Sequence, residues 1–76
     1  MAAAQLPLAM AGAGEVVRVA GIRGTGELRQ HLAELGFVDG AEVRVVSRAA
    51  GDVIVSVKGA RLALNRSMAS HITVSI

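Results

Sequence analysis

The stretch LAELGFVDGAEVRVV, residues 32–46, decides the fold, because it contains in order the end of a helix, a turn and a strand. Gly36 stands where a left-handed residue often closes a helix, and glycine adopts that conformation without steric cost. The dipeptide Asp39-Gly40 is a turn signal. Alternating apolar and polar residues then predict a half-buried strand over residues 41–48. The stretch therefore predicts a helix that leads directly into a sheet.

The helix that this stretch closes is expected over residues 25–36. Thr25 can accept a hydrogen bond from a first-turn amide through its hydroxyl, which suits it to the N-cap position. Leu28, Leu32 and Leu35 follow at i, i+4 and i+7, and this spacing gives the helix a single narrow apolar stripe. One short amphipathic helix is therefore expected, with its other faces in solvent.

Four further stretches alternate apolar and polar residues over short lengths and are predicted to be strands: residues 15–22, 52–58, 60–64 and 72–76. Residues 65–71 are expected to form one helical turn before the last strand, capped by Asn65. About five closely spaced strands with one short helix indicate an all-β domain. A chain of 76 residues is too short to cover two sheets. A small barrel is therefore expected, in which closure removes the exposed edges.

The N-terminal residues are predicted to be distinct from this barrel. Residues 1–13 are rich in alanine and are expected to form a flexible or extended arm, whereas residues 14–76 form the domain. Pro7 would confine the arm to a sheet edge, because proline lacks the backbone N–H that a ladder needs. The arm can lie against the domain through apolar residues that alternate along it, Leu6, Leu8 and Met10.

Two segments of the chain resemble the FeoA family of ferrous iron transport proteins. Residues 32–46 are similar to the family's central motif, in which leucines and a Leu-Gly step precede a turn glycine and a valine-rich strand. Residues 57–74, VKGARLALNRSMASHITV, are similar to its closing motif, which has a glycine, a short strand ending in Ala-Leu and an Ala-x-x-Ile step. Those features stand here at Gly59, Ala63-Leu64 and Ala69–Ile72, and the family's opening leucine and glycine are matched by Leu8 and Gly14.

Three positions depart from the family's pattern. His31 stands where arginine is common before the leucine, Val53 stands where a loop often continues with proline, and Asn65 stands where arginine is common. None of these changes bears on the fold. Two of them remove a cation, which weakens any carry-over of a basic partner-binding surface from the family.

The resemblance implies a small SH3-like barrel and a cytoplasmic, non-catalytic accessory protein of bacterial ferrous iron uptake. It implies that the protein binds or regulates FeoB, a membrane transporter with a cytosolic GTP-binding domain. It implies no tightly bound cofactor, with Fe(II) or another transition metal held only transiently. The alternatives from other classes are an SH3-like nucleic-acid-binding module and a small regulator that binds a transition metal.

Composition argues against several other classes. There are 0 cysteines, so disulfides and thiolate zinc sites are excluded. The chain's one lysine, Lys58, follows no phosphate-loop glycine pattern. No nucleophile stands with a base and an orienting group, so no enzyme activity is expected. No run approaches about 18 apolar residues, so the chain is not expected to span a membrane.

The candidate metal ligands are few. His31 has Glu27 at i−4 on a neighbouring part of the predicted helix, and His71 lies near the last helical turn. Two donors on one helical face form a fragment of a site, because a metal centre needs several converging ligands. Histidines that make local hydrogen bonds are the favoured interpretation of both positions.

A nucleic-acid interface would need a basic stripe, often with aromatic residues for stacking. Arg18, Arg44 and Arg48 are expected to share one outer sheet face, but Glu42 interrupts it and Phe37 is the only aromatic residue. The formal net charge is only +2, which gives weak electrostatic steering. A solvated face of mixed charge is favoured, and no nucleic-acid partner is expected.

A protein-binding patch is the interaction that the sequence favours most. Leu35, Phe37 and Val38 come at the end of the predicted helix and just before a turn, where an apolar patch can be exposed. Arg29 and Arg66 are candidates for its rim. The competing interpretation is that Phe37 plugs one end of the barrel. Such a patch, together with the N-terminal arm, is also compatible with a homo-oligomer.

Overall fold

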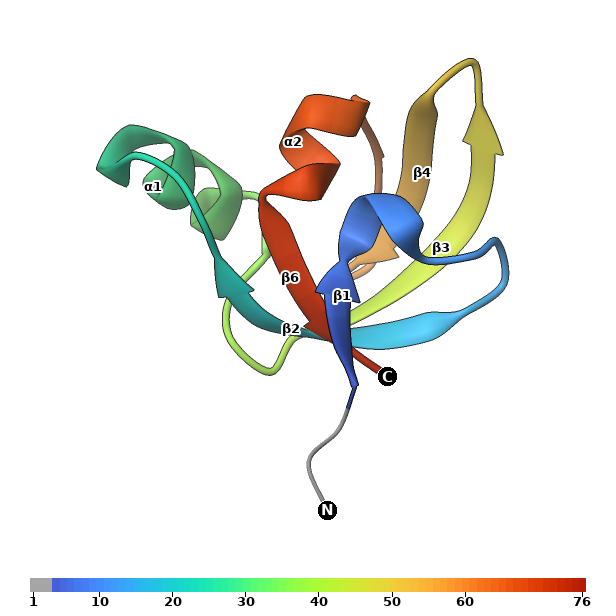
Figure 1. Cartoon of the computed structure of the whole chain (residues 1–76), viewed down its shortest axis with the longest axis horizontal. Coiled ribbons are helices and arrows are strands. Elements are labelled where there is room, and N and C mark those ends of the chain that lie inside the picture. The colour runs from blue at the N-terminus through green and yellow to red at the C-terminus, as the bar shows by residue number, and fades with distance from the viewer. Residues whose placement is uncertain (1–3) are drawn as a thin grey trace.

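One six-stranded antiparallel sheet organises residues 4–76, the part of the chain that this computed structural model describes (Figure 1). Along the sheet the strand order is β1-β6-β2-β3-β4-β5. The strands are β1 (Gln5–Pro7), β2 (Val16–Ile22), β3 (Glu42–Ala49), β4 (Asp52–Val57), β5 (Ala60–Leu64) and β6 (Ile72–Ser75). The helical elements are a 3-10 turn, η1 (Leu8–Met10), and two helices, α1 (Gly26–Glu34) and α2 (Arg66–Ser70). Neither helix in this part of the chain has the length and apolarity to cross a membrane.

Helix α1 begins and ends where the sequence predicts. The Thr25 hydroxyl accepts a hydrogen bond from the Leu28 amide at 3.2 Å, as an N-cap does. At the other end Gly36 has φ of 111°. Its amide donates to the Ala33 carbonyl, and the Phe37 amide donates to the Leu32 carbonyl, both at 3.0 Å. This pair of bonds is a Schellman motif, which turns the chain sharply out of the helix and toward β3.

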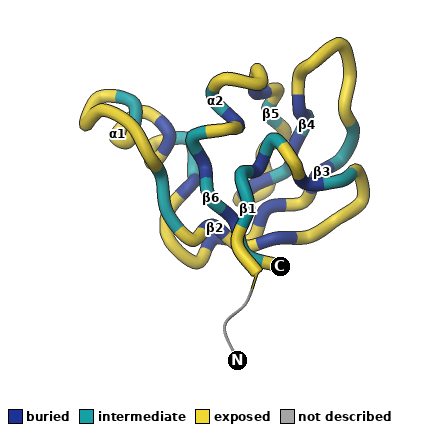
Figure 2. The backbone as a smooth tube through the Cα atoms, viewed as in Figure 1, coloured by how far each residue is buried: buried dark blue, intermediate teal, exposed yellow. Residues whose placement is uncertain are grey.

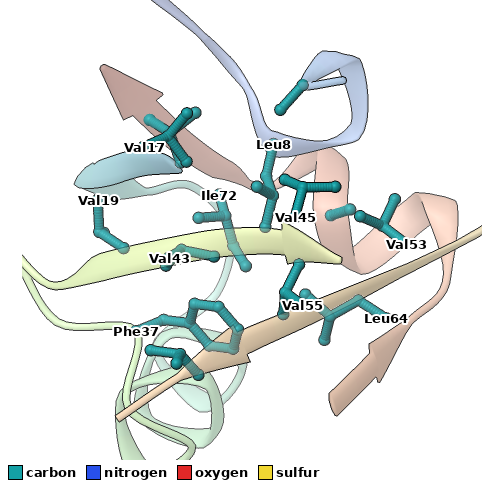
Figure 3. Packing of buried hydrophobic residues seen from close by; sticks show 14 of the residues in the cluster. Leu8, Val17, Val19, Phe37, Val43, Val45, Val53, Val55, Leu64 and Ile72 are labelled. Carbon is teal, nitrogen blue, oxygen red and sulfur yellow. The ribbon is translucent and has the colours of Figure 1, made fainter. Parts of the chain in front are cut away.

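Apart from the ring of Phe37 the core is aliphatic, and it fills the curve of the sheet (Figures 2 and 3). Alternate residues of each long strand point inward, as the period-two pattern predicts. No polar or charged residue is buried in the described part of the chain. The sheet's buried members include Val17, Val19, Val43, Val45, Val53, Val55, Val57, Leu64, Ile72 and Val74.

The N-terminal residues contribute both a strand and two core side chains, Leu8 and Ala11. Residues 1–3 lie outside the described part, and β1 pairs with β6 at one edge of the sheet, which gives six strands instead of about five. Pro7 lies in this edge strand, as expected. The alternation predicted through Leu8 and Met10 is wrong, because the 3-10 turn η1 changes the period there. Leu8 is fully buried, whereas Met10 is 71% exposed.

A bulge in β3 corrects the predicted basic face. The register of β3 against β4 shifts between Val45 and Ser47, and one extra residue reverses the face of every residue that follows. Arg48 therefore lies opposite the buried Val53, and its guanidinium donates to the Ala11 carbonyl at 2.7 Å. The prediction that Arg48 shares an outer face with Arg18 and Arg44 is wrong for this reason.

The two ends of the sheet stay apart, which corrects the expectation that closure removes the edges. β1 and β5 end the strand order, and no ladder joins them in the described residues. Helix α2 contacts η1, β4, β5 and β6, so it lies across the opening between the two halves of the bent sheet (Figure 1). Helix α1 lies to one side, and its outward surface is left for the site described next.

Candidate partner-binding groove beside α1

An open hollow of about 400 Å³ lies between α1 and the turn that follows it. Helix α1 contributes one wall through Gly26, Arg29, Gln30 and Ala33. These positions follow the spacing i, i+3, i+4 and i+7, so they form one helical face. The opposite wall comes from the end of β2 and from the turn after the helix, through Ile22, Val38 and Asp39. We call this hollow the α1 groove.

The sequence explains why this face of α1 stays open. Leu32, on the other side of the helix, is fully buried, and Leu28 and Leu35 are half-buried against the core. That stripe attaches the helix to the domain, which leaves the groove face exposed. Gly26 and Ala33 carry little or no side chain, so two of the four wall positions add almost no bulk to fill the hollow.

Phe37 lies beneath the groove. Its side chain is fully buried, and Figure 3 shows the ring among the core side chains on the side where α1 lies. The Schellman motif fixes this position, because the Phe37 amide is held by the Leu32 carbonyl. The structure therefore agrees with the interpretation that Phe37 plugs one end of the barrel. Exposed apolar surface at the groove comes instead from Val38, which is 42% exposed.

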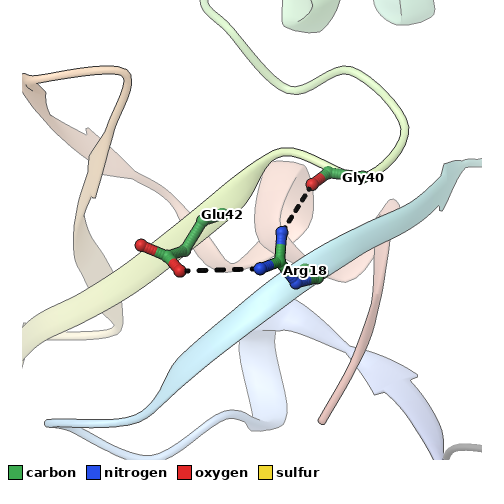
Figure 4. A network of polar contacts seen from close by, with 3 residues as sticks. All are labelled: Arg18, Gly40 and Glu42. Carbon is green, nitrogen blue, oxygen red and sulfur yellow. Dashed lines mark hydrogen bonds and ion pairs between the residues drawn. The ribbon is translucent and has the colours of Figure 1, made fainter.

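A short polar network holds the turn beside the groove (Figure 4). Arg18 donates to the Gly40 carbonyl at 3.1 Å and lies 3.9 Å from a carboxylate oxygen of Glu42. The Gly40 amide in turn donates to the Val19 carbonyl at 2.7 Å. These contacts fasten the turn that carries Val38 to strand β2. Sequence analysis placed Arg18 only on an outer sheet face with Arg44 and Arg48, so this role was missed.

The groove contains two charged groups of opposite sign, Arg29 and Asp39. In the described residues the single ion pair joins Arg18 to Glu42, so neither Arg29 nor Asp39 belongs to one. Both side chains are exposed and free to pair with a ligand. The groove thus combines an apolar rim at Val38 with a cation on one wall and an anion on the other.

The structure brings together some of the predicted partner residues and separates others. Arg29, Phe37 and Val38 all border the α1 groove. Leu35 packs half-buried against the core, and Arg66 is exposed on α2, so neither lines it. The sequence analysis missed the remaining wall residues: Ile22, Gly26, Gln30, Ala33 and Asp39. Only the three on α1, Gly26, Gln30 and Ala33, have a helical spacing that was readable.

The predicted metal donors do not converge. Glu27 and His31 are exposed on α1, and His71 follows α2 as its C-cap. The His71 Nδ1 atom lies 2.7 Å from the Ser67 carbonyl oxygen, to which it can donate. Its ring also lies against Gly24, because a Cβ there would be 3.2 Å from the His71 Cδ2 atom. Within residues 4–76 no group of three or more histidine or carboxylate side chains is placed to hold a metal ion.

Comparison with known proteins adds the family context. A model of the FeoA domain matches residues 6–76. A candidate Fe(2+) transport protein A of Methanocaldococcus jannaschii is 37% identical over 68 residues, which cover 90% of this chain and 83% of that protein. The crystal structure of an iron uptake regulatory protein, FeoA, has 32% sequence identity and a TM-score of 0.85, over 93% of this chain and 95% of that one.

A third similarity bears on the fold class. The zinc complex of Stenotrophomonas maltophilia FeoA superimposes with a TM-score of 0.79 at 28% identity, over 90% of this chain and 87% of that one. That protein is described as an SH3 domain protein that acts, in its authors' suggestion, as a ferrous iron transport activating factor. The sequence-based prediction of an all-β, SH3-like fold with one short helix is confirmed.

Proposed function

The chain belongs to the FeoA domain family, as its two motifs predicted, and on that premise we propose that it is a cytoplasmic, non-catalytic accessory protein of ferrous iron uptake. In this proposal it binds the cytosolic domain of a FeoB-like membrane GTPase transporter through the α1 groove. Fe(II) is then the cargo of the transporter, and GTP hydrolysis belongs to the partner. The groove itself is the observation that supports a binding role.

The groove suits a protruding side chain of a protein partner. Phe37 lies beneath it as a fully buried support, and its exposed apolar rim is Val38. An inserted apolar side chain would gain about 25 cal/mol for each Å² removed from water. Arg29 and Asp39 stand on opposite walls, so a partner with the complementary pair of charges would bind in one orientation only.

The sequence supports a role without chemistry of its own. It contains no phosphate-loop pattern around its one lysine, and no nucleophile is paired with a base and an orienting group. The side chain of one of its two histidines, His71, makes a local contact with the Ser67 carbonyl. Nucleotide binding is accordingly assigned to the transporter in this proposal.

A titration of isotope-labelled protein with the cytosolic domain of the cognate FeoB-like transporter tests the proposal directly. We expect backbone amide shifts to concentrate at residues 26–33 and 37–39, with guanine nucleotide present or absent. Binding that shifts other surfaces would reject the α1 groove as the interface. The absence of any binding, in both nucleotide states, would reject the cytosolic domain as the partner.

Two substitutions on α1 supply a matched pair for this test. Ala33→Gln places a longer neutral side chain in the groove and should weaken binding by about tenfold, since truncating or obstructing a central contact removes a large share of binding energy. Glu34→Gln introduces the same side chain at the next position, which does not line the groove. It should leave the dissociation constant within about twofold, because rim and distant charges contribute little. Equal effects of the two variants would contradict the proposed interface.

A further inference from the structure

The two edges of the sheet are built differently. The edge strand β1 has three residues, contains Pro7, and is extended at its start by a bond from the Ile76 amide to the Ala4 carbonyl. The edge strand β5 has five residues without proline, and each pairs with β4 in unbroken register. Proline and shortness protect an edge from further pairing, whereas a regular strand is a template for it. β5 therefore has the geometry to accept another strand.

The hairpin before β5 determines which backbone groups are free. Lys58 and Gly59 form a two-residue turn with φ of 51° and 79°, as in a type I′ turn. Such a turn is closed by a hydrogen-bonded pair, here Val57 and Ala60, and the bonding then alternates along the strands. Arg61 and Ala63 consequently direct their N–H and C=O groups away from β4. In residues 4–76 no turn, loop or side-chain hydrogen bond reaches these groups.

The surroundings of this edge are basic. No Asp or Glu follows Asp52 in the sequence, whereas Lys58, Arg61 and Arg66 flank or belong to β5. The ladder also places Arg44 in one row with Ser56 and Arg61, each opposite the next on neighbouring strands. These side chains share the outer face of the sheet. In the described residues the single ion pair lies elsewhere, between Arg18 and Glu42.

From this combination we propose that the edge of β5 binds an acidic, extended segment of a partner protein, which adds as a seventh strand. The free N–H and C=O groups of Arg61 and Ala63 form the new ladder. The guanidinium of Arg61 attracts carboxylates on the outer face of the added strand, and that of Arg44, two strands away on β3, adds to the positive charge of the same face. Half-buried Leu62 faces inward and packs against its apolar residues. The preferred segment alternates acidic and apolar residues.

Two other occupants fit less well. A second copy pairing through its own β5 would bring Lys58, Arg61 and Arg66 of both copies together, and like charges on paired strands destabilise a sheet. A single-stranded nucleic acid would be expected to stack on aromatic side chains, but the chain's one aromatic residue, Phe37, is buried. The β5 edge is formed by other residues than the α1 groove, so this inference does not rest on the proposed function.

The test uses the whole labelled chain and two short synthetic peptides, acetyl-(Glu-Val)3-amide and acetyl-(Lys-Val)3-amide, followed by NMR. We expect the acidic peptide to shift the amides of Arg61 and Ala63 and to slow their hydrogen exchange. The basic peptide should leave both unchanged. Raising the salt concentration should weaken binding of the acidic peptide, because the attraction is between exposed charges.

Variants at one position separate strand addition from simple charge attraction. Ala63→Pro removes an outward N–H while leaving the ladder to β4 available, so binding should fall about tenfold or more. Ala63→Thr keeps that N–H and favours a strand, so it should bind like the original chain. Equal effects of both peptides, shifts confined to other surfaces, or no shift with the acidic peptide would overturn the proposal. Concentration-dependent dimerisation that Ala63→Pro abolishes would overturn it in favour of a second copy.

Discussion

The two helices start in the same way and have different surroundings. Thr25 caps α1 and Asn65 caps α2, with side-chain oxygens 3.2 and 2.8 Å from the amides of Leu28 and Met68. Helix α2 lies among η1, β4, β5 and β6. Helix α1 is longer, yet it buries only Leu32 completely and is exposed along most of its length (Figure 2). Local signals thus set where a helix begins, and its neighbours determine whether a face remains for binding.

The difference follows from how each helix is joined to the sheet. Helix α2 connects β5 to β6 and is fixed at both ends by strands. Helix α1 is attached through Leu28 and Leu32 and, at its C-terminal end, through the Schellman motif at Gly36 and the buried ring of Phe37. The same attachment therefore stabilises the C-terminal end of α1 and leaves its groove face exposed.

The largest expected effect tests whether Phe37 holds α1 in place. Phe37→Ala removes the largest fully buried side chain of the core and should lower the free energy of unfolding by about 3–5 kcal/mol in urea denaturation. Phe37→Leu retains most of the volume, should cost less than about 1.5 kcal/mol, and keeps the protein folded for comparison. A loss under about 1 kcal/mol for the alanine variant would show that Phe37 is not the attachment of α1.

The second effect concerns the glycine that ends α1. Gly36→Ala places a Cβ at φ of 111° and 3.1 Å from the Lys58 Cγ atom, so it should cost about 1–2 kcal/mol. Gly26→Ala is the control at the other end of the same helix, where φ is not positive and no atom lies within 4 Å of the added carbon. That variant should be neutral or up to about 1 kcal/mol more stable. Equal unfolding energies for the two would contradict the role of Gly36.

Much of this fold follows from short-range patterns in the sequence. The caps Thr25 and Asn65, the closing Gly36 and the period-two valines each act through neighbours a few residues away, so they were readable without tertiary structure. The bulge after Val45 was not, because it appears only in the pairing of β3 with β4. Arg48 was misplaced as a result.

The candidate site was harder to predict than the fold. The sequence identified Phe37 and Val38 as candidate partner-binding residues, but it left open whether Phe37 faces solvent or core. That choice depends on the Schellman bonds and on the strands beneath the ring. The face of α1 that borders the groove stays open because no other element packs on it. A single sequence carries little information about which faces of a helix remain uncovered.

The third prediction compares the two caps. Asn65→Ala and Thr25→Ala each remove one capping bond, worth about 1 kcal/mol to its helix. Because α2 lies across the opening of the sheet, Asn65→Ala should lower global stability by that full amount in urea denaturation. Thr25→Ala should lower it by about half as much, since the first turn of α1 can fray without disturbing the sheet. Hydrogen exchange should show faster exchange confined to the first turn of α1; faster exchange throughout the sheet would contradict this difference.

The smallest effects concern the polar contacts beside the α1 groove. Within the described residues, α2 takes part in no ion pair. The Arg18–Glu42 pair is 3.9 Å long with side chains 64% and 63% exposed, so Glu42→Gln should change the free energy of unfolding by less than about 0.5 kcal/mol. Arg18→Gln also loses the bond to the Gly40 carbonyl and should cost slightly more, up to about 1 kcal/mol. A double-mutant cycle read by urea denaturation separates the two contacts. If the ion pair alone holds the turn in place, both variants will shift the amides of residues 38–40 to the same extent. If the bond to the Gly40 carbonyl holds it, only Arg18→Gln will shift them. In that case the groove will also retain its shape at high salt.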